Sequence, residues 1–464
     1  MERQRGAVMV LATLMMGAAL IAWQHRASLS QLIMGQQSLD QATSAAALGA
    51  AQWHARILNA HALLNRTEMA HQVAMAHLMT MASAWEMRER IGEQARRNNP
   101  PASLIGMFFG PGQAFAYRSA MRGGDRMALK DLRDAFESHD RLLAGNLKRA
   151  RADLRRDLAK RTESLIHEIL RRNLGAGLWA SPGFSVQVSH PGGLPSRVQR
   201  MNNDAKWQGW LDAVVRRHGY LKDRSSFRPA FSPMYPQCPI LKHLLVRTGE
   251  TIVTVNGNWS ADDTLAFHSV RPLPKWCYFR EYSMGWARVK VTPKSYPSTD
   301  VDDGPVIEVP DSFKETTFRK WIMTIPKIIG NGIVPFYNQV AVLRAKNRTV
   351  QWQRSTRPVP YQLDPVLSSP VLTVSTKVSV ASLGQRTWRV RLALAGLLDA
   401  HKPDWPRQLH AQASARVEYD PMRTLLNGPP EPPSLLQAFW DARQVPVPES
   451  EVQRSDLQKP TVWK

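Results

Sequence analysis

Residues 6–23 read GAVMVLATLMMGAALIAW, a run of apolar and small residues without a charge. As a helix, a segment of this length rises by about 27 Å, roughly the thickness of a hydrocarbon core. Trp23 closes the run with a side chain that favours a membrane interface. We therefore predict that residues 1–26 form a membrane-anchoring helix, held in the bilayer by residues that include Gly6, Leu11, Leu14, Leu20 and Trp23.

The flanks of this run favour a retained anchor over a cleaved signal peptide. Arg3 and Arg5 precede it, which predicts a cytoplasmic N-terminus and a body on the far side of the membrane. A cleaved signal peptide is the alternative, but residues 24–26 lead into more helix-favouring sequence without a small-residue cleavage site.

The chain then continues through residues 27–99 without a proline. Alanine, leucine, methionine and glutamine dominate this stretch, and all four are strong helix formers. A basic last turn at Arg96 and Arg97, followed by Pro100, is typical of a helix end. We predict one long helix over residues 27–99.

Small and polar residues on this helix predict an interaction surface. Ala45, Ala46 and Ala47 would let another helix or a sheet approach closely. Asn59, Asn65 and Arg66 interrupt an apolar surface, as polar groups of an interface do. The helix also carries histidines at 54, 61, 71 and 77, but no carboxylate is placed to complete a ligand set, so we predict no metal site.

Several short motifs of this stretch occur together in one known family. Arg5-Gly6-Ala7 precedes the apolar run and Ala45-Ala46-Ala47-Leu48 follows it. Further matching pieces are Leu58-Asn59-Ala60, Leu64-Asn65-Arg66 and Gln72-Val73-Ala74-Met75-Ala76, with weaker echoes at 413–419 and 439–443. In these residues the chain resembles the TadE/TadG-like proteins of tight-adherence (Flp-type, type IVc) pilus assembly.

The resemblance implies a non-enzymatic pilus-assembly component in the bacterial inner membrane, single-pass, with a periplasmic body. Its implied partners are the inner membrane and pilin-like or platform proteins, and a homo-oligomer is compatible with it. The interaction helix would use Ala45, Ala46, Ala47, Asn59, Asn65, Arg66 and Gln72. Leu11 stands where processed pilins carry Glu, so we do not expect prepilin peptidase cleavage. The stretch 223–227 (DRSSF) lacks the last serine of the family's metal-dependent adhesion motif.

Residues 100–177 combine a loop with a second long helix. Glycines at 106, 110, 112, 123 and 124 predict a loop over 100–125. Apolar residues over 125–173 recur every three, four or seven positions, which indicates an amphipathic helix. We predict that this helix packs on the first as an antiparallel hairpin. A coiled coil with a partner chain is the alternative.

The segment 178–444 is richer in proline and tryptophan and predicts a mixed α/β body. Alternating segments, with an Asn-Gly turn signal after residue 255, indicate an antiparallel sheet over about 250–420. Helices are predicted near 207–217, 311–323 and 434–443, and a flexible tail over 445–464. The predicted fold class is therefore α+β.

The two cysteines, Cys238 and Cys277, lie 39 positions apart, which does not suit a zinc site. In an exported body they form a candidate disulfide, and two buried thiols are the alternative.

Catalytic and nucleic-acid signatures are absent from the sequence. It contains no Gly-x-Ser-x-Gly elbow and no phosphate-binding loop, and His167 lacks the second histidine of a zinc-peptidase helix. The formal charge of +23 is spread along the chain, which does not indicate a specific nucleic-acid site. We predict no enzyme activity and no cofactor. The alternatives are a coiled-coil adaptor of a secretion or efflux complex and an envelope enzyme with an unrecognised site.

Overall fold

The computed structural model describes residues 2–122, 126–179, 183–189, 198–200, 204–221, 223–230, 244–253, 258–273, 276–293, 349–354, 361–363, 371–379, 408–419, 435 and 438–448. It confirms an α+β fold, and it divides into two compact units. Unit 1 contains Met1–Leu64, Arg151–Gln199 and Tyr361–Lys464, and unit 2 contains Asn65–Ala150 and Arg200–Pro360. These borders differ from the predicted succession of segments, because each unit combines separated parts of the chain.

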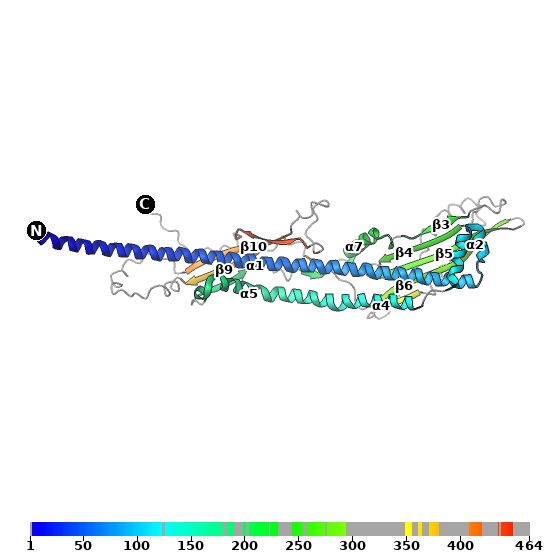
Figure 1. The fold of residues 1–464 in the computed structure, drawn as a ribbon, viewed down its shortest axis with the longest axis horizontal. Helices are drawn as coiled ribbons and strands as arrows, with labels where there is room; N and C mark the ends of the chain where they lie inside the picture. The colour runs from blue at the N-terminus through cyan, green and yellow to red at the C-terminus, as the bar shows by residue number, and fades with distance from the viewer. Residues whose placement is uncertain are drawn as a thin grey trace. The chain divides into compact units, whose positions relative to one another are not determined.

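A single helix, α1 (Glu2–Arg96), contributes to both units and confirms the predicted long helix (Figure 1). It contains 95 residues, which corresponds to a length of about 140 Å. Its end follows from the local sequence. Asn98 takes a left-handed conformation with φ of 52°, and the Asn99 amide donates to the Gln94 carbonyl at 3.1 Å. This is a common way to end a helix before proline.

The predicted membrane anchor is not supported. Within the described residues, no helix combines the length and the apolar character needed to cross a membrane. The predicted single-pass topology over residues 1–26, with its inner-membrane location, is therefore wrong.

Unit 1 is built on a four-stranded antiparallel sheet in the order β1-β9-β10-β11. Its strands are β1 (Ser185–Ser189), β9 (Val371–Ser379), β10 (Gln408–Tyr419) and β11 (Trp440–Val445). A separate pair joins β2 (Val198–Arg200) and β8 (Tyr361–Leu363). Alternate residues of β9 and β10 are buried in one core with α1 residues between Leu39 and Leu58.

Unit 2 is built on a five-stranded sheet in the order β3-β4-β5-β6-β7. Its strands are β3 (Ser226–Pro229), β4 (Leu244–Val253), β5 (Trp259–Leu273), β6 (Trp276–Pro293) and β7 (Thr349–Arg354). All neighbours are antiparallel except β6 and β7, which run parallel. The helix α7 (Asp204–Arg217) also belongs to this unit and agrees with the predicted short helix.

The second long helix consists of α4 (Arg126–Arg141), a π-helical segment (Leu142–Leu147) and α5 (Lys148–Trp179). In unit 1, Gly49 faces Ile169 and His54 contacts Thr162 at 3.0 Å. Because partner numbers fall as α1 numbers rise, α5 packs antiparallel to α1 there.

Two local predictions are wrong. Residues 100–125 were expected to form a loop, but they contain α2 (Ala102–Phe109), α3 (Pro111–Ser119) and a 3-10 turn (Ala120–Arg122). The expected helix over 434–443 is wrong at its end, where Trp440 begins β11. The six β11 positions pair with β10, so tertiary pairing overrides local helix propensity. The helix predicted at 311–323 lies outside the described residues.

Gly285 on β6 marks a close approach of α1 to the sheet of unit 2. A Cβ there would lie 2.7 Å from the Met87 carbonyl oxygen and 2.5 Å from Ile91 Cγ1. We expect Gly285→Ala to lower the free energy of unfolding by about 1–3 kcal/mol, measured by urea unfolding.

Gly209→Ala is the matched control for this substitution. Gly209 lies on α7, and a Cβ there would meet nothing within 4 Å. We expect this change to raise the free energy of unfolding by about 0.5–1 kcal/mol, because alanine favours a helix. Equal effects of the two substitutions would contradict the close approach at Gly285.

Candidate interaction site on the long helix

The small-residue run of α1 faces the interior of unit 1. Ala46 and Ala47 are fully buried, whereas Ala45 is exposed. Their core also contains three alanines of β10, Ala411, Ala413 and Ala415, each at most 4% exposed. Small side chains on both elements let the helix backbone approach the sheet closely. At Ala46 and Ala47, the chain's own sheet therefore covers the surface that was predicted to bind a partner protein.

Asn59 joins α1 to the edge strand β11 of the same unit. Its Nδ2 donates to the Trp440 carbonyl oxygen, and the Trp440 amide donates to Asn59 Oδ1, both at 2.9 Å. A side-chain amide that bonds both backbone groups of one residue makes the two hydrogen bonds that an adjacent β-strand would make. Asn59 therefore fixes where β11 begins.

We expect Asn59→Ala to lower the free energy of unfolding by about 1–3 kcal/mol, because two backbone groups of Trp440 lose a partner. Asn173→Ala on α5 is the control, since Asn173 is exposed and bonds only within its own helix in the described structure. Chemical unfolding of both variants tests this. If Asn59→Ala lowers the free energy of unfolding no more than Asn173→Ala does, the two hydrogen bonds between Asn59 and Trp440 do not contribute to stability.

The remaining predicted interaction residues lie in unit 2. Gln72 is fully buried, and its Oε1 accepts a hydrogen bond from Trp259 Nε1 on β5 at 3.1 Å. Asn65 is fully buried as well, and Arg66 is exposed. Gln72 thus ties α1 to the sheet of unit 2 and is not available to another chain.

The histidines of α1 also take part in packing within each unit. His61 is fully buried, and burial together with Arg151 and Arg155 lowers its pKa to about 4. His71 Nδ1 lies 2.7 Å from His139 Nδ1 on α4, and burial followed by the neighbouring His139 lowers the pKa of His71. Over the described part of the chain, no three His, Cys, Asp or Glu side chains gather in a way that could hold a metal ion.

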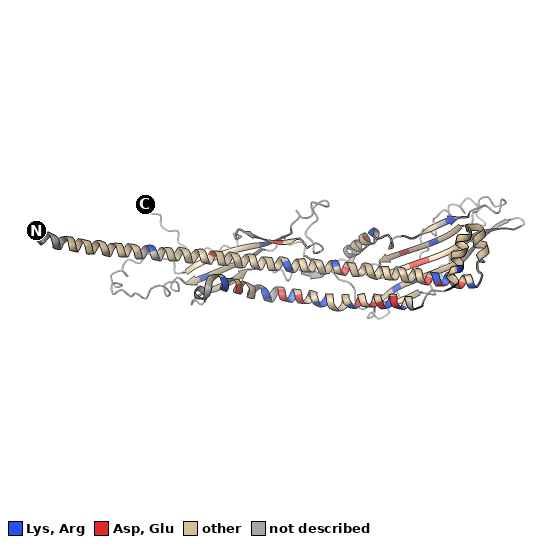
Figure 2. Ribbon diagram, in the orientation of Figure 1, with Lys and Arg blue, Asp and Glu red and all other residues tan. Residues whose placement is uncertain are grey.

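The first part of α1 is the largest exposed apolar stretch among the described residues. Leu11, Leu14, Leu20 and Trp23, predicted as anchor residues, are 59–67% exposed. Gly6 lies in the same helix. In Figure 2 this end of the helix is drawn almost without charge, in contrast to α4 and α5. Further exposed residues of the stretch are Val8, Met9, Val10, Met15, Met16, Ile21, Leu29, Ile33 and Met34.

Unit 2 also contains a buried charge network that no sequence motif indicated. Its centre is Arg224, within the stretch compared with an adhesion motif. Arg224 Nη2 donates to Asp263 Oδ2 at 3.0 Å, and Arg224 Nε donates to Asp263 Oδ1 at 3.3 Å. Asp263 is fully buried, and it lies where a Cβ on Gly249 would be, with Oδ1 only 2.3 Å from that position. The glycine therefore makes room for the carboxylate.

Arg224 also bonds the strands around it. Its Nη1 donates to Thr251 Oγ1 at 3.0 Å and to the Tyr220 carbonyl oxygen at 3.1 Å. Its Nη2 reaches the carbonyl oxygens of Glu250 and Asp262 at 3.3 and 3.4 Å. Through these hydrogen bonds the guanidinium of Arg224 links two strands and a loop, so its role is structural.

A row of charges crosses the same sheet. Glu250 on β4 pairs in register with Asp262 on β5, and Asp262 pairs with Arg288 on β6. Arg288 Nε lies 3.4 Å from Asp262 Oδ1. Burial, only partly opposed by Arg288, raises the pKa of Asp262 to about 6, and burial also raises the pKa of Glu250. The contribution of these groups to stability therefore depends on pH.

The candidate disulfide cannot be placed, because Cys238 lies outside the described residues. Comparison with known proteins gives no match: no family model, no curated protein and no solved structure is significantly similar to this chain.

Proposed function

We propose that this chain is a non-enzymatic structural component of tight-adherence pilus assembly or of a related secretion machinery. The observation that carries the proposal is the apolar end of α1. Its large side chains are exposed over Val8–Trp23, on all faces of the helix. A helix that is apolar all round favours burial among other apolar helices.

The partners proposed for this stretch are pilin-like or platform subunits that offer apolar helices of their own. Leu14 at 67% and Met15 at 67% exposure point to different sides of the helix, as neighbours in sequence do. More than one partner helix is therefore needed to cover them. The motifs shared with TadE/TadG-like proteins, such as Arg5-Gly6-Ala7, support this choice of system.

The coiled-coil adaptor is less well supported, because the apolar stripe of the second long helix is already used. Leu158, Ile166 and Leu170 of α5 are at most 1% exposed and belong to the core of unit 1. A stripe that packs within its own chain offers no apolar seam to a second coiled-coil strand.

Deletion of the gene tests the proposed function, and we expect it to abolish surface pili and adherence. Restoring the wild-type gene should restore both, whereas a Leu11→Asp/Leu14→Asp variant should not, because two carboxylates cannot be buried among apolar helices. Leu63→Asp is the control, at a 54% exposed leucine further along α1. Normal piliation of the deletion strain would refute the function. Normal piliation with Leu11→Asp/Leu14→Asp would refute the role of the helix end.

A further inference from the structure

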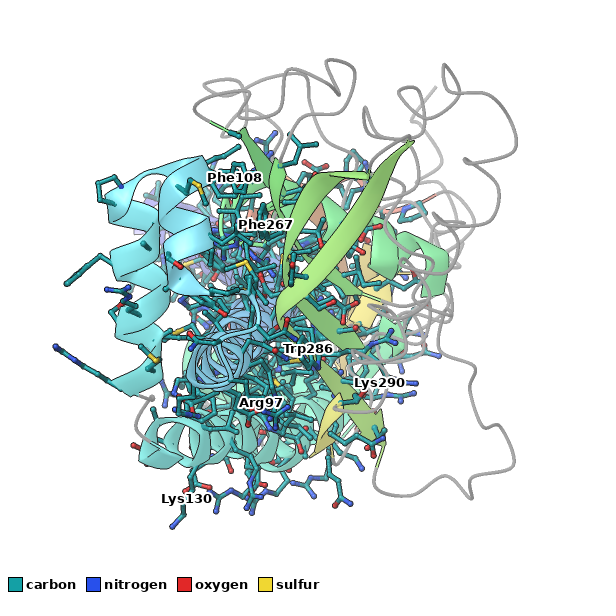
Figure 3. All side chains as sticks on the ribbon, turned by 90° about the vertical axis from the view of Figure 1, so that its right-hand side faces the viewer. Arg97, Phe108, Lys130, Phe267, Trp286 and Lys290 are labelled. Carbon is teal, nitrogen blue, oxygen red and sulfur yellow. The ribbon has the colours of Figure 1, made fainter. Side chains whose placement is uncertain are left out.

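The helical hairpin α2–α3 in unit 2 has an inner face that is held firmly against the sheet. The rings of Phe108 and Phe109 on α2 lie 5.7 and 5.2 Å from the ring of Phe267 on β5. Figure 3 shows Phe108 on this hairpin directed toward Phe267. Ile105 is 1% exposed in the same core. The hairpin is thus held against the sheet by its inner face, and the opposite face does not take part in this packing.

The outer face carries large apolar side chains without cover in the described structure. Phe115 is 71% exposed, Met107 is 47% exposed and Met121 is 36% exposed. Phe115 is the most exposed aromatic side chain among the described residues. Exposed phenylalanine and methionine side chains on consecutive short helices are typical of an interaction surface.

Three arginines, Arg96, Arg118 and Arg122, lie in or beside the same segment of the chain. Arg118 follows Phe115 by three positions on α3 and so lies on the same face of that helix, and Arg122 lies in the 3-10 turn that follows α3. Arg96 Nη1 donates to the Met121 carbonyl oxygen at 2.9 Å, so its guanidinium is held at the edge of this face. From residue 94 to 124 the sequence contains no Asp, no Glu and no Lys.

We infer that Met107, Phe115 and Met121, together with Arg96, Arg118 and Arg122, form a docking surface for a protein segment that carries carboxylates beside apolar side chains. We call these six residues the α2–α3 surface. Aromatic residues, methionine and arginine are the types enriched at protein interfaces, and lysine, glutamate and aspartate are depleted there. The planar guanidinium also binds a carboxylate through two parallel hydrogen bonds.

A lipid surface fits this composition less well. Helices that lie on anionic membranes use lysine as well as arginine on their polar face, and this surface contains no lysine. The inference goes beyond the proposed function, which rests on the apolar end of α1 in unit 1, because it adds a second and chemically different docking site.

The test uses the full-length protein and a fluorescein-labelled peptide of 12 residues in which Glu alternates with Leu and Phe. Fluorescence anisotropy measures its affinity for wild type, for Phe115→Ser and for Arg118→Ala/Arg122→Ala. Arg155→Ala/Arg171→Ala on α5 is the control, because it removes the same charge from exposed arginines elsewhere. The same peptide with Gln in place of Glu tests the need for carboxylates. Vesicles of phosphatidylglycerol test binding to a lipid surface.

We expect both α2–α3 surface variants to bind the Glu peptide at least tenfold more weakly than wild type, and the control to bind within twofold. The Gln peptide should bind at least tenfold more weakly to wild type. Unchanged affinity of Phe115→Ser, or an equal loss in the α5 control, would overturn the inference. Vesicle binding that depends on Phe115, without peptide binding, would overturn it in favour of a lipid surface. Unchanged melting temperatures would show that the variants fold.

Discussion

Arg224→Met is expected to lower the free energy of unfolding by about 3–5 kcal/mol, the largest effect of any single substitution considered for this chain. The reason is that the substitution removes the main ion-pair partner of Asp263. This carboxylate is fully buried, and its next cation, Arg247, is 3.7 Å away on a side chain that is 41% exposed. A buried carboxylate that loses its hydrogen-bonded arginine keeps the cost of its desolvation without the compensating contacts.

A double variant separates this effect from lost packing. Arg224→Met/Asp263→Leu removes both charges, and we expect it to be more stable than Arg224→Met, because no charge is then left buried. Arg228→Met on β3 is the control, since Arg228 is exposed, and it should change stability by less than about 0.5 kcal/mol. Urea unfolding gives all three values. A double variant as unstable as the single one would mean that Arg224 acts by packing alone.

The second large effect is a dependence of stability on pH at Asp262. Its pKa is about 6 in the folded protein against 3.8 for the free side chain. Between these values the unfolded chain has released the proton and the folded chain still binds it. The stabilising contribution is therefore complete below pH 3.8 and is lost as the pH rises to about 6. The difference in pKa corresponds to on the order of 3 kcal/mol.

Asp262→Asn tests this sign, because asparagine does not titrate. The stability of wild type relative to Asp262→Asn should fall between pH 4 and 6 and level off above. The comparison with the variant is needed because His61 acts in the opposite direction. With its pKa lowered to about 4, His61 favours the folded state more as the pH rises from 4 toward 6.5. A relative stability that rises between pH 4 and 6 would contradict the raised pKa of Asp262.

Patterns that act over a few residues could be read from the sequence. The absence of proline over 27–99, the basic turn at Arg96 and Arg97, and Pro100 predicted the long helix and its end. Alternation predicted an antiparallel sheet over about 250–420, and β9 and β10 lie within that range. The small residues at 45–47 were identified as a packing surface, but sequence spacing does not say whether the partner is another chain or a distant part of the same one.

Features that depend on distant pairing could not be predicted. The strands fall into two larger sheets, apart from the pair β2–β8, because β9 and β10 pair with β1 while β4, β5 and β6 pair with one another. No local pattern selects between these arrangements. Arg224 looked like part of a loop motif. Its role depends on Asp263, 39 residues later, and on the absence of a side chain at Gly249. The membrane prediction is wrong because it rested on one short uncharged run, whereas no helix among the described residues combines the length and the apolar character needed to cross a membrane.

The order of residues in unit 1 has a consequence for synthesis on the ribosome. The hydrogen bond between Asn59 and Trp440 cannot form until Trp440, which lies 381 positions later, has been synthesised. At about 5–20 residues per second, roughly 20–75 s separate the emergence of the helix from that of its last strand. Unit 2, which ends at Pro360, is complete before β9 has been made. The helix face that carries Ala46 and Ala47 is therefore made early, whereas β10, which packs on it, is made late in translation.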